Sequence, residues 1–210
     1  DYEKPNHKIN TSARFDYLRT SAGDQVARGH VSSEYRYRYL KNKMNRWVRI
    51  RGFIGNTFLY KNASGVANQY YQMSLSGANG MQDVFLEGYY FFRSGSNSRI
   101  RAGNWGGFNR YSNFGTTSFW MASANAYIQL PINPNIFGAF ADYGTFFDGY
   151  TIQSAYNFGL GIRFGEMIGI YFPLYRSSNM GELFTNNYGK EVRLTLKFNL
   201  INKPLKLGIG

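Results

Sequence analysis

Apolar and polar residues alternate with a period of two along most of this 210-residue chain. In the run YNFGLGIRF, from Tyr156 to Phe164, every second residue is large and apolar, and the residues between them are Asn, Gly, Gly and Arg. A period of two places successive side chains on opposite faces of a β-strand, whereas helical side chains repeat every 3.6 residues. The pattern therefore predicts an all-β chain.

About ten segments show this alternation and are predicted to be strands. They span about 8 to 19, 26 to 40, 46 to 60, 68 to 77, 82 to 93, 117 to 130, 134 to 146, 152 to 165, 167 to 175 and 189 to 200. No linker, low-complexity run or block of charge divides them. Residues 1–210 are therefore predicted to form one domain.

The predicted connections alternate between short and long. The short ones span 41–45, 77–81, 131–133 and 165–166, and the long ones span 61–68, 94–116 and 176–188. Up-and-down barrels in outer membranes show this pattern, with tight turns at one rim and long loops at the other. Strands of about ten residues also suit a tilted crossing of the hydrocarbon layer.

The two faces of these strands differ in residue type. The chain is 19% aromatic, and rings stand near strand ends at Tyr35, Tyr39, Tyr60, Tyr70, Tyr89, Phe92, Tyr127, Tyr143, Phe164 and Tyr175. Aromatic girdles occupy this level at membrane interfaces. The opposite faces combine Gly with charged residues, which suits a narrow, filled interior. We therefore expect a closed up-and-down antiparallel transmembrane β-barrel of about ten strands.

Composition excludes several classes of site. Without Cys, the chain has no disulfide framework, thiolate zinc site, iron–sulfur centre or cysteine nucleophile, and two His leave little for an imidazole site. We expect no metal and no cofactor. No apolar run approaches the about 20 residues of a spanning helix. The net charge of +12 is assigned to the barrel lumen and its rims, and nucleic acid is not an expected partner.

Charged residues on the polar faces form the first candidate site. The predicted inward charges are Glu34, Arg36, Arg38, Arg49, Arg51, Glu87, Asp142, Arg163, Arg193 and Lys197. They would either line a narrow pore that prefers anions or form a network of paired charges that fills the barrel. A barrel of about ten strands favours the filled interior.

Two further candidates lie outside that network. His30, with Asp24, Ser32 and Ser33 nearby in sequence, has the residue types of a Ser/His/Asp hydrolase, although no spacing fixes such a geometry. The connection 94–116 interleaves cations and aromatics, which would suit a sugar, an anionic lipid headgroup, a protein partner or single-stranded nucleic acid. The other interpretation is a surface loop that packs over the barrel mouth. Its residues are Arg99, Arg101, Trp105, Arg110 and Tyr111.

The pattern as a whole resembles the outer-membrane β-barrels of Gram-negative bacteria. The run from Met167 to Leu207, with the segments MIGIYFPLYRS (167–177) and KEVRLTLKFNL (190–200), is similar to the membrane barrel that follows gluzincin-aminopeptidase-like domains in large Bacteroidetes proteins. The zinc motif H-E-x-x-H of those peptidases is absent, because Lys8 follows His7 and Val31 follows His30. The resemblance therefore implies that this chain is the membrane part of a longer protein.

We expect an outer-membrane anchor or scaffold with surface-exposed loops and no catalysis of its own. Its partners would be membrane lipid, including the lipopolysaccharide leaflet, and a protein of a larger outer-membrane complex. The alternatives are an outer-membrane enzyme with a rim site near His30, a narrow anion-preferring pore, and a soluble basic β-protein that binds polysaccharide or nucleic acid.

Overall fold

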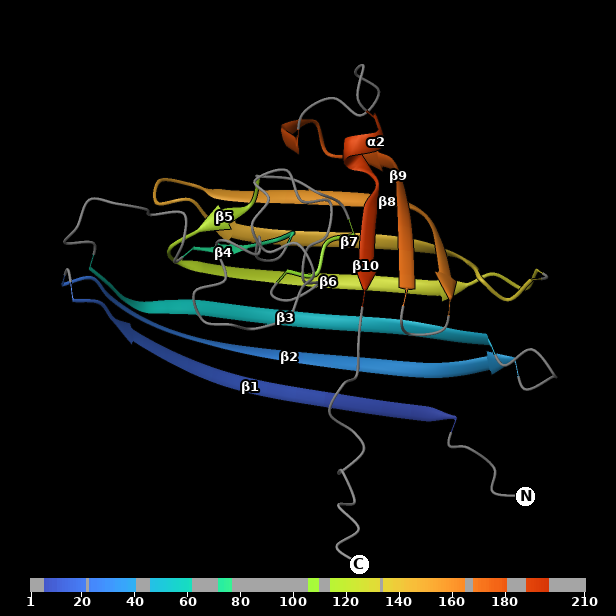
Figure 1. Ribbon diagram of the computed structural model, residues 1–210, viewed down its shortest axis with the longest axis horizontal. Helices are drawn as coiled ribbons and strands as arrows, with labels where there is room; N and C mark the ends of the chain where they lie inside the picture. Colours follow the sequence, from blue (N-terminus) through green and yellow to red (C-terminus); the bar gives the residue numbers. More distant parts are fainter. Residues whose placement is uncertain are drawn as a thin grey trace, which may run out of the picture.

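The computed structural model describes residues 6–21, 23–40, 46–61, 72–76, 106–109, 114–132, 134–164, 168–180 and 188–196 (Figure 1). One antiparallel sheet of eight strands has the order β1-β2-β3-β6-β7-β8-β9-β10. Its strands are β1 (His7–Arg19), β2 (Gln25–Leu40), β3 (Arg46–Lys61), β6 (Trp120–Gln129), β7 (Phe137–Phe147), β8 (Ile152–Phe164), β9 (Ile168–Arg176) and β10 (Arg193–Leu196). The all-β prediction is confirmed.

The other described elements are short. β4 (Met73–Ser74) and β5 (Thr116–Thr117) pair with each other in a separate two-stranded sheet. The 3-10 turn η2 (Ser178–Met180) and the helix α2 (Tyr188–Glu191) lie between β9 and β10. Within the described ranges, no helix is both long and apolar enough to cross a bilayer.

The prediction that 68–77 forms a strand of the large sheet is wrong. β3 pairs directly with β6, from Val48 opposite Ile128 to Asn56 opposite Trp120, so this segment does not lie between them in the sheet. Its described part, residues 72–76, contributes only β4, and the predicted strand at 82–93 lies outside the described ranges. Residues 73–76 alternate apolar side chains with serines, but all four are buried, so the alternation there does not mark a strand of the large sheet.

The two ends of the sheet carry different connections. The β2–β3, β6–β7 and β8–β9 connections lie at the end where β1 begins, called here the turn end (Figure 1). The other end, called the loop end, carries the β1–β2 and β7–β8 turns, the β3–β6 connection 62–119 and the β9–β10 connection 177–192. The predicted segregation of the longest connections to one end is confirmed.

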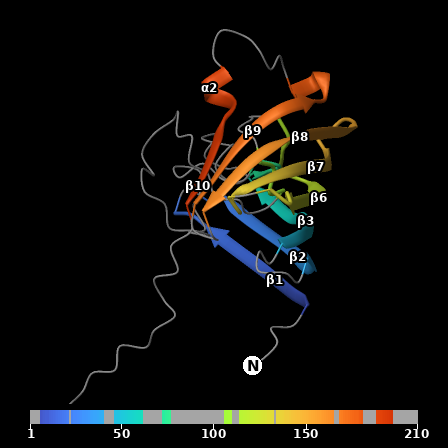
Figure 2. The ribbon, with the colours of Figure 1, turned by 90° about the vertical axis from the view of Figure 1, so that its right-hand side faces the viewer.

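The sheet is strongly curved from β1 round to β9, so it has a hollow side (Figures 1 and 2). Each strand pairs with its neighbour in the order given above, and the pairings among the described residues do not join β1 to β10. As far as it is described, the sheet is open, with β1 and β10 as its edges.

Candidate functional site

Strand register places one row of polar residues across seven of the eight strands of the sheet. Directly paired residues of an antiparallel sheet point to the same face. The pairings connect, in order across seven strands, Asn10, Glu34, Arg51, Asn125, Asp142, Asn157 and Arg176. We call this set the polar row, the face that carries it the inner face, and the opposite face the outer face.

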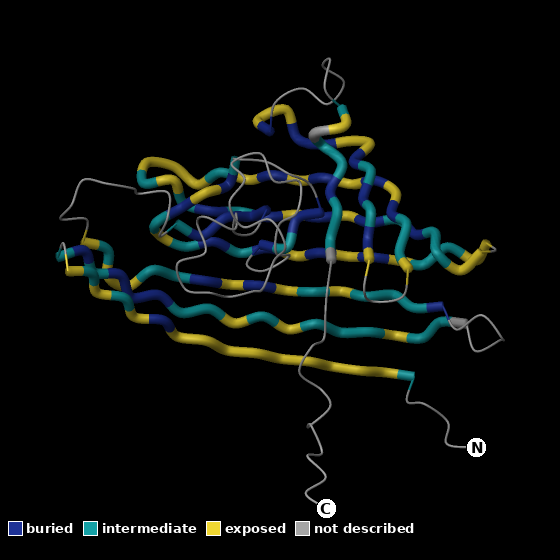
Figure 3. The backbone as a smooth tube through the Cα atoms, viewed as in Figure 1, coloured by how far each residue is buried: buried dark blue, intermediate teal, exposed yellow. Residues whose placement is uncertain are grey.

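The outer face is apolar and exposed. On β8, the outer-face residues Ile152, Tyr156, Phe158, Leu160 and Phe164 are 40% to 66% exposed. Figure 3 shows the alternation of buried and exposed positions along β6, β7 and β8. Outer-face charges in the described strands stand only at strand ends, as with Arg19 and Lys61.

The inner face is covered by the described parts of the β3–β6 connection, residues 72–76, 106–109 and 114–119, called here the inserted segment. Met73, Leu75 and Phe108 are fully buried in a core cluster with Phe53 and other inner-face side chains. Glycines of the sheet make room for them, because a Cβ on residue 144 would lie 2.5 Å from Leu75 Cδ2 and one on residue 55 would lie 2.7 Å from Met73 Sδ. Part of the inner face is thus an apolar core.

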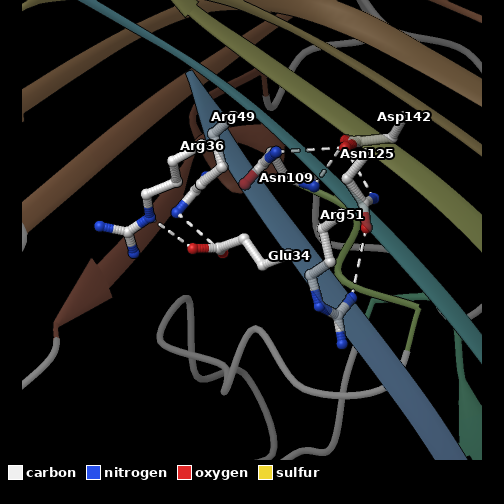
Figure 4. Close-up of polar contacts among 7 residues, drawn as sticks. All are labelled: Glu34, Arg36, Arg49, Arg51, Asn109, Asn125 and Asp142. Carbon is white, nitrogen blue, oxygen red and sulfur yellow. Dashed lines mark hydrogen bonds and ion pairs between the residues drawn. The ribbon is translucent and has the colours of Figure 1, made fainter. Parts of the chain in front are cut away.

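Asp142 joins the inserted segment to the polar row. Its carboxylate accepts hydrogen bonds from Asn109 through the backbone N–H at 2.7 Å and the amide Nδ2 at 3.2 Å. The Nδ2 atom of Asn125 also donates to it, at 3.0 Å (Figure 4). The Nδ2 atom of Asn157 donates to it at 3.1 Å. Asp142 is 2% exposed, and four N–H donors satisfy it in place of water.

Further hydrogen bonds hold the inserted segment against the sheet. Ser123 Oγ donates to the carbonyl of Gly106 at 2.7 Å, and Arg193 Nη1 donates to the carbonyl of Phe108. Within the segment, the N–H of Phe108 donates to the carbonyl of Leu75 at 2.9 Å. These bonds supply partners for backbone groups that would otherwise be buried and unsatisfied.

Arginines gather on the inner face toward the turn end. Glu34 forms ion pairs with Arg36, at 2.6 Å from Nε, and with Arg49, at 3.8 Å from Nη1 (Figure 4). Arg49 and Arg163 both stack on the ring of Tyr127, with Cζ 5.8 and 5.1 Å from its centroid. This part of the inner face is therefore strongly cationic.

Every described member of the predicted charge set lies on one face. Register aligns Glu34, Arg36, Arg38, Arg49, Arg51, Asp142, Arg163 and Arg193 on the inner face. Glu87 and Lys197 lie outside the described residues, as do the predicted loop residues Arg99, Arg101, Trp105, Arg110 and Tyr111. Tyr127 departs from the predicted lipid-facing aromatic set, since it lies on the inner face and is 3% exposed.

Sequence reasoning did not single out the asparagines. Asn125 on β6 and Asn157 on β8 each alternate with apolar residues, and the polar face of each strand was the available signal. Asn109 comes from the inserted segment, and no local pattern connects it with Asp142. Three asparagine side chains and the backbone N–H of Asn109 thus satisfy the buried carboxylate of Asp142.

The residues around His30 do not assemble a hydrolase geometry. His30 lies on the inner face with its ring 5.5 Å from that of Phe53, and its Nδ1 has no hydrogen-bond partner among the described residues. Ser32 hydrogen-bonds Ser12 at 2.9 Å, and Ser33 points to the outer face. A serine nucleophile requires a hydrogen bond to its base, which neither serine makes.

No protein-family model, curated protein or solved structure matches this chain. Within the described ranges, no group of three or more His, Cys, Asp or Glu side chains is placed to hold a metal ion. The chemistry of the site therefore consists of buried hydrogen bonding around Asp142 and cationic charge around Arg49.

Proposed function

We propose that this chain is an outer-membrane β-barrel that serves as a membrane anchor or scaffold, with an interior filled by the inserted segment and the polar row. The inverted polarity of the sheet carries the proposal. Asp142 is 2% exposed, whereas Phe158 and Leu160, on the opposite face, are 44% and 47% exposed. A sheet in water has the reverse arrangement, because apolar surface is favourably removed from water.

The free energy available from covering the exposed apolar side chains supports lipid as the neighbour of the outer face. In the described part of the chain, 22 large hydrophobic side chains are at least 37% exposed. Full burial of one such side chain stabilises by about 1.5–3 kcal/mol. Covering about half of each would contribute on the order of 20 kcal/mol. An apolar surface of this extent marks a membrane or protein interface rather than a solvated face.

Closure of the sheet follows from the same environment. β1 has 13 residues, and about half of them direct an N–H and a C=O toward the free edge. Each unsatisfied group in hydrocarbon costs several kcal/mol, so an open edge would cost tens of kcal/mol. We therefore propose that β1 and β10 pair with each other in the bilayer.

The filled interior favours a scaffold over an open pore. A barrel of about eight strands encloses a space that side chains alone can fill. Here the inserted segment adds buried backbone and the side chains of Met73, Leu75 and Phe108 to that space. A narrow anion-preferring pore is the second candidate, because the turn-end half of the inner face carries Arg36, Arg49 and Arg163.

Membrane fractionation and fluorescence test the proposal together. The protein should require detergent for extraction and show heat-modifiable migration on gels, and full solubility without detergent would contradict it. For the fluorescence arm, Trp47→Phe with Trp105→Phe leaves Trp120 on the outer face. Brominated acyl chains should quench this variant.

The matched control for the fluorescence arm is the variant that retains only Trp47, which pairs with Arg38 on the inner face. Brominated lipid should quench it much less than the Trp120 variant. Equal quenching of the two variants would refute the assignment of the outer face to lipid.

A further inference from the structure

Three arginines converge at the turn-end half of the inner face. The arginine cluster consists of Arg36, Arg49 and Arg163. Arg36 and Arg49 share the carboxylate of Glu34, and Arg49 and Arg163 share the ring of Tyr127. Arg49 and Arg36 are close enough to Arg163 to repel it electrostatically. The cluster therefore concentrates positive charge on a partly buried surface.

Among the described residues, no acidic side chain pairs with Arg163. Glu34 accepts from Arg36 at 2.6 Å, whereas its contact with Arg49 is long, at 3.8 Å. Among the described carboxylates, none lies within ion-pair distance of Arg163. Like charges at short range in a low-dielectric interior are destabilising, and a bound anion would relieve that repulsion.

Tyr127 supplies a second, independent feature. Its side chain is 3% exposed, and its hydroxyl has no hydrogen-bond partner among the described residues. The ring is seated against Gly138 and Gly161, since a Cβ on either glycine would meet it closely. Burial of an unpaired hydroxyl costs about 1–3 kcal/mol, and an anion beside the two stacked guanidiniums would accept a hydrogen bond from it.

The cluster is accessible from the turn end. Arg163 is the penultimate residue of β8, and Arg36 pairs with Lys8 near the start of β1. The inserted segment covers the inner face toward the opposite end, around Met73 and Phe108. The side chains of Arg36 and Arg49 each retain 18% exposure, so ions can reach them.

We propose that the arginine cluster binds a phosphate group, free or as a phosphomonoester, between Arg49 and Arg163 with the Tyr127 hydroxyl as a further donor. Guanidinium groups present paired N–H donors that match phosphate oxygens, and such charge-assisted bonds are among the strongest in proteins. The proposed site depends only on residues of the inner face, so its test is independent of the assignment of the outer face to lipid.

Titration of inorganic phosphate into the detergent-solubilised full chain tests the site, with sodium chloride holding the ionic strength constant. Calorimetry should show saturable binding, and phosphate should raise the unfolding midpoint. Arg49→Gln and Arg163→Gln should each weaken binding about tenfold or more, as expected for loss of a charge-assisted contact. Arg19→Gln, at the loop end of β1, is the matched control and should leave binding unchanged.

Two results would overturn the site: absence of saturable binding to the folded protein, or equal weakening by Arg19→Gln and Arg163→Gln. A phosphorus assay on lipid extracted from the purified protein separates the two sources of phosphate. Lipid phosphorus near one equivalent that is lost in Arg163→Gln identifies a headgroup. Saturable binding of inorganic phosphate without lipid phosphorus identifies a soluble ligand.

Discussion

Replacing Asp142 with alanine should release the inserted segment from the inner face. The carboxylate accepts four hydrogen bonds, two of them from Asn109 in the inserted segment. Alanine would leave four buried donors unpaired, at about 1–3 kcal/mol each. It would also remove the desolvation cost of a buried charge, which offsets part of that loss. Removing one partner of a buried charged contact costs about 3–5 kcal/mol, so we expect Asp142→Ala to lower the free energy of unfolding by about 4 kcal/mol.

A single introduced thiol reports this release. The chain contains no Cys, and Ser76 is fully buried in the inserted segment. In the folded protein, Ser76→Cys should react slowly with a maleimide, because labelling requires local opening. If the free energy of local opening decreases by the whole of about 4 kcal/mol, Asp142→Ala should accelerate labelling about a thousandfold, because about 1.4 kcal/mol corresponds to a tenfold change. An acceleration of at least about tenfold is the required result.

Thr145→Ala is the matched control for this measurement. Thr145 lies on β7 like Asp142, but on the outer face, and its Oγ1 donates one hydrogen bond to the carbonyl of Gln153 at 3.0 Å. Its loss should leave the labelling rate of Ser76→Cys unchanged. Rapid labelling in the otherwise unaltered chain, or equal rates with and without Asp142→Ala, would refute the role assigned to the Asp142 contacts.

Three further changes test other parts of the structure. Leu160→Arg, on the outer face of β8, should destabilise the lipid-reconstituted protein by about 2–4 kcal/mol in urea unfolding, and an effect below 0.5 kcal/mol would argue against lipid contact. Gly138→Ala should lower the unfolding midpoint because its Cβ would meet the Tyr127 hydroxyl, whereas Gly52→Ala, with no atom within 4 Å, should leave it unchanged. Backbone N–H donors in the β7–β8 turn hold the pKa of Asp148 below its ordinary value. The NMR shifts of the turn should therefore stay unchanged at pH 5 and change only as the pH falls below about 4. Asp148→Asn should abolish that transition.

Alternation located eight of the sheet strands because each has two different environments. On β8, for example, the small or polar residues Asn157, Gly159 and Gly161 face the interior, and Phe158 and Leu160 face outward. Any strand under that constraint carries period two in its own sequence. The sequence of each strand therefore marks its own position, and the strands could be predicted without knowing what covers either face of the sheet.

The same signal failed for the β3–β6 connection. Met73 and Leu75 alternate with Ser74 and Ser76 in sequence, but all four residues are buried, and only the two apolar side chains join the core cluster on the inner face. Period two reports that the two sides of a segment differ in polarity, but not whether a neighbouring strand is hydrogen-bonded beside it. Placement of the inserted segment depends on contacts such as those of Asn109 with Asp142, which are distant in sequence and carry no local pattern.

The sequence predicted that the charged residues share one face of the sheet, but not which of them contact one another. Alternation placed Glu34, Arg36 and Arg49 together on the inner face, and the ion pairs to Glu34 agree with the expectation of paired charge. It also assigned Tyr127 to the wrong face, because a tyrosine fits both a membrane girdle and a polar interior. Its stacking with Arg49 and Arg163 follows from register between β3, β6 and β8, which one strand alone does not contain.

The structure shows which face of the sheet is covered, and the sequence alone does not. Period two puts Asp142 and Phe158 on opposite faces without saying which face is covered. The inserted segment covers the face of Asp142 and satisfies its carboxylate, so the apolar face is left outside. Exposed apolar side chains extend from Ile9 on β1 to Ile168 on β9. A protein partner would cover one side of so curved a sheet, whereas lipid surrounds every strand at once. The presence of such side chains on every strand of the large sheet from β1 to β9 therefore favours the bilayer.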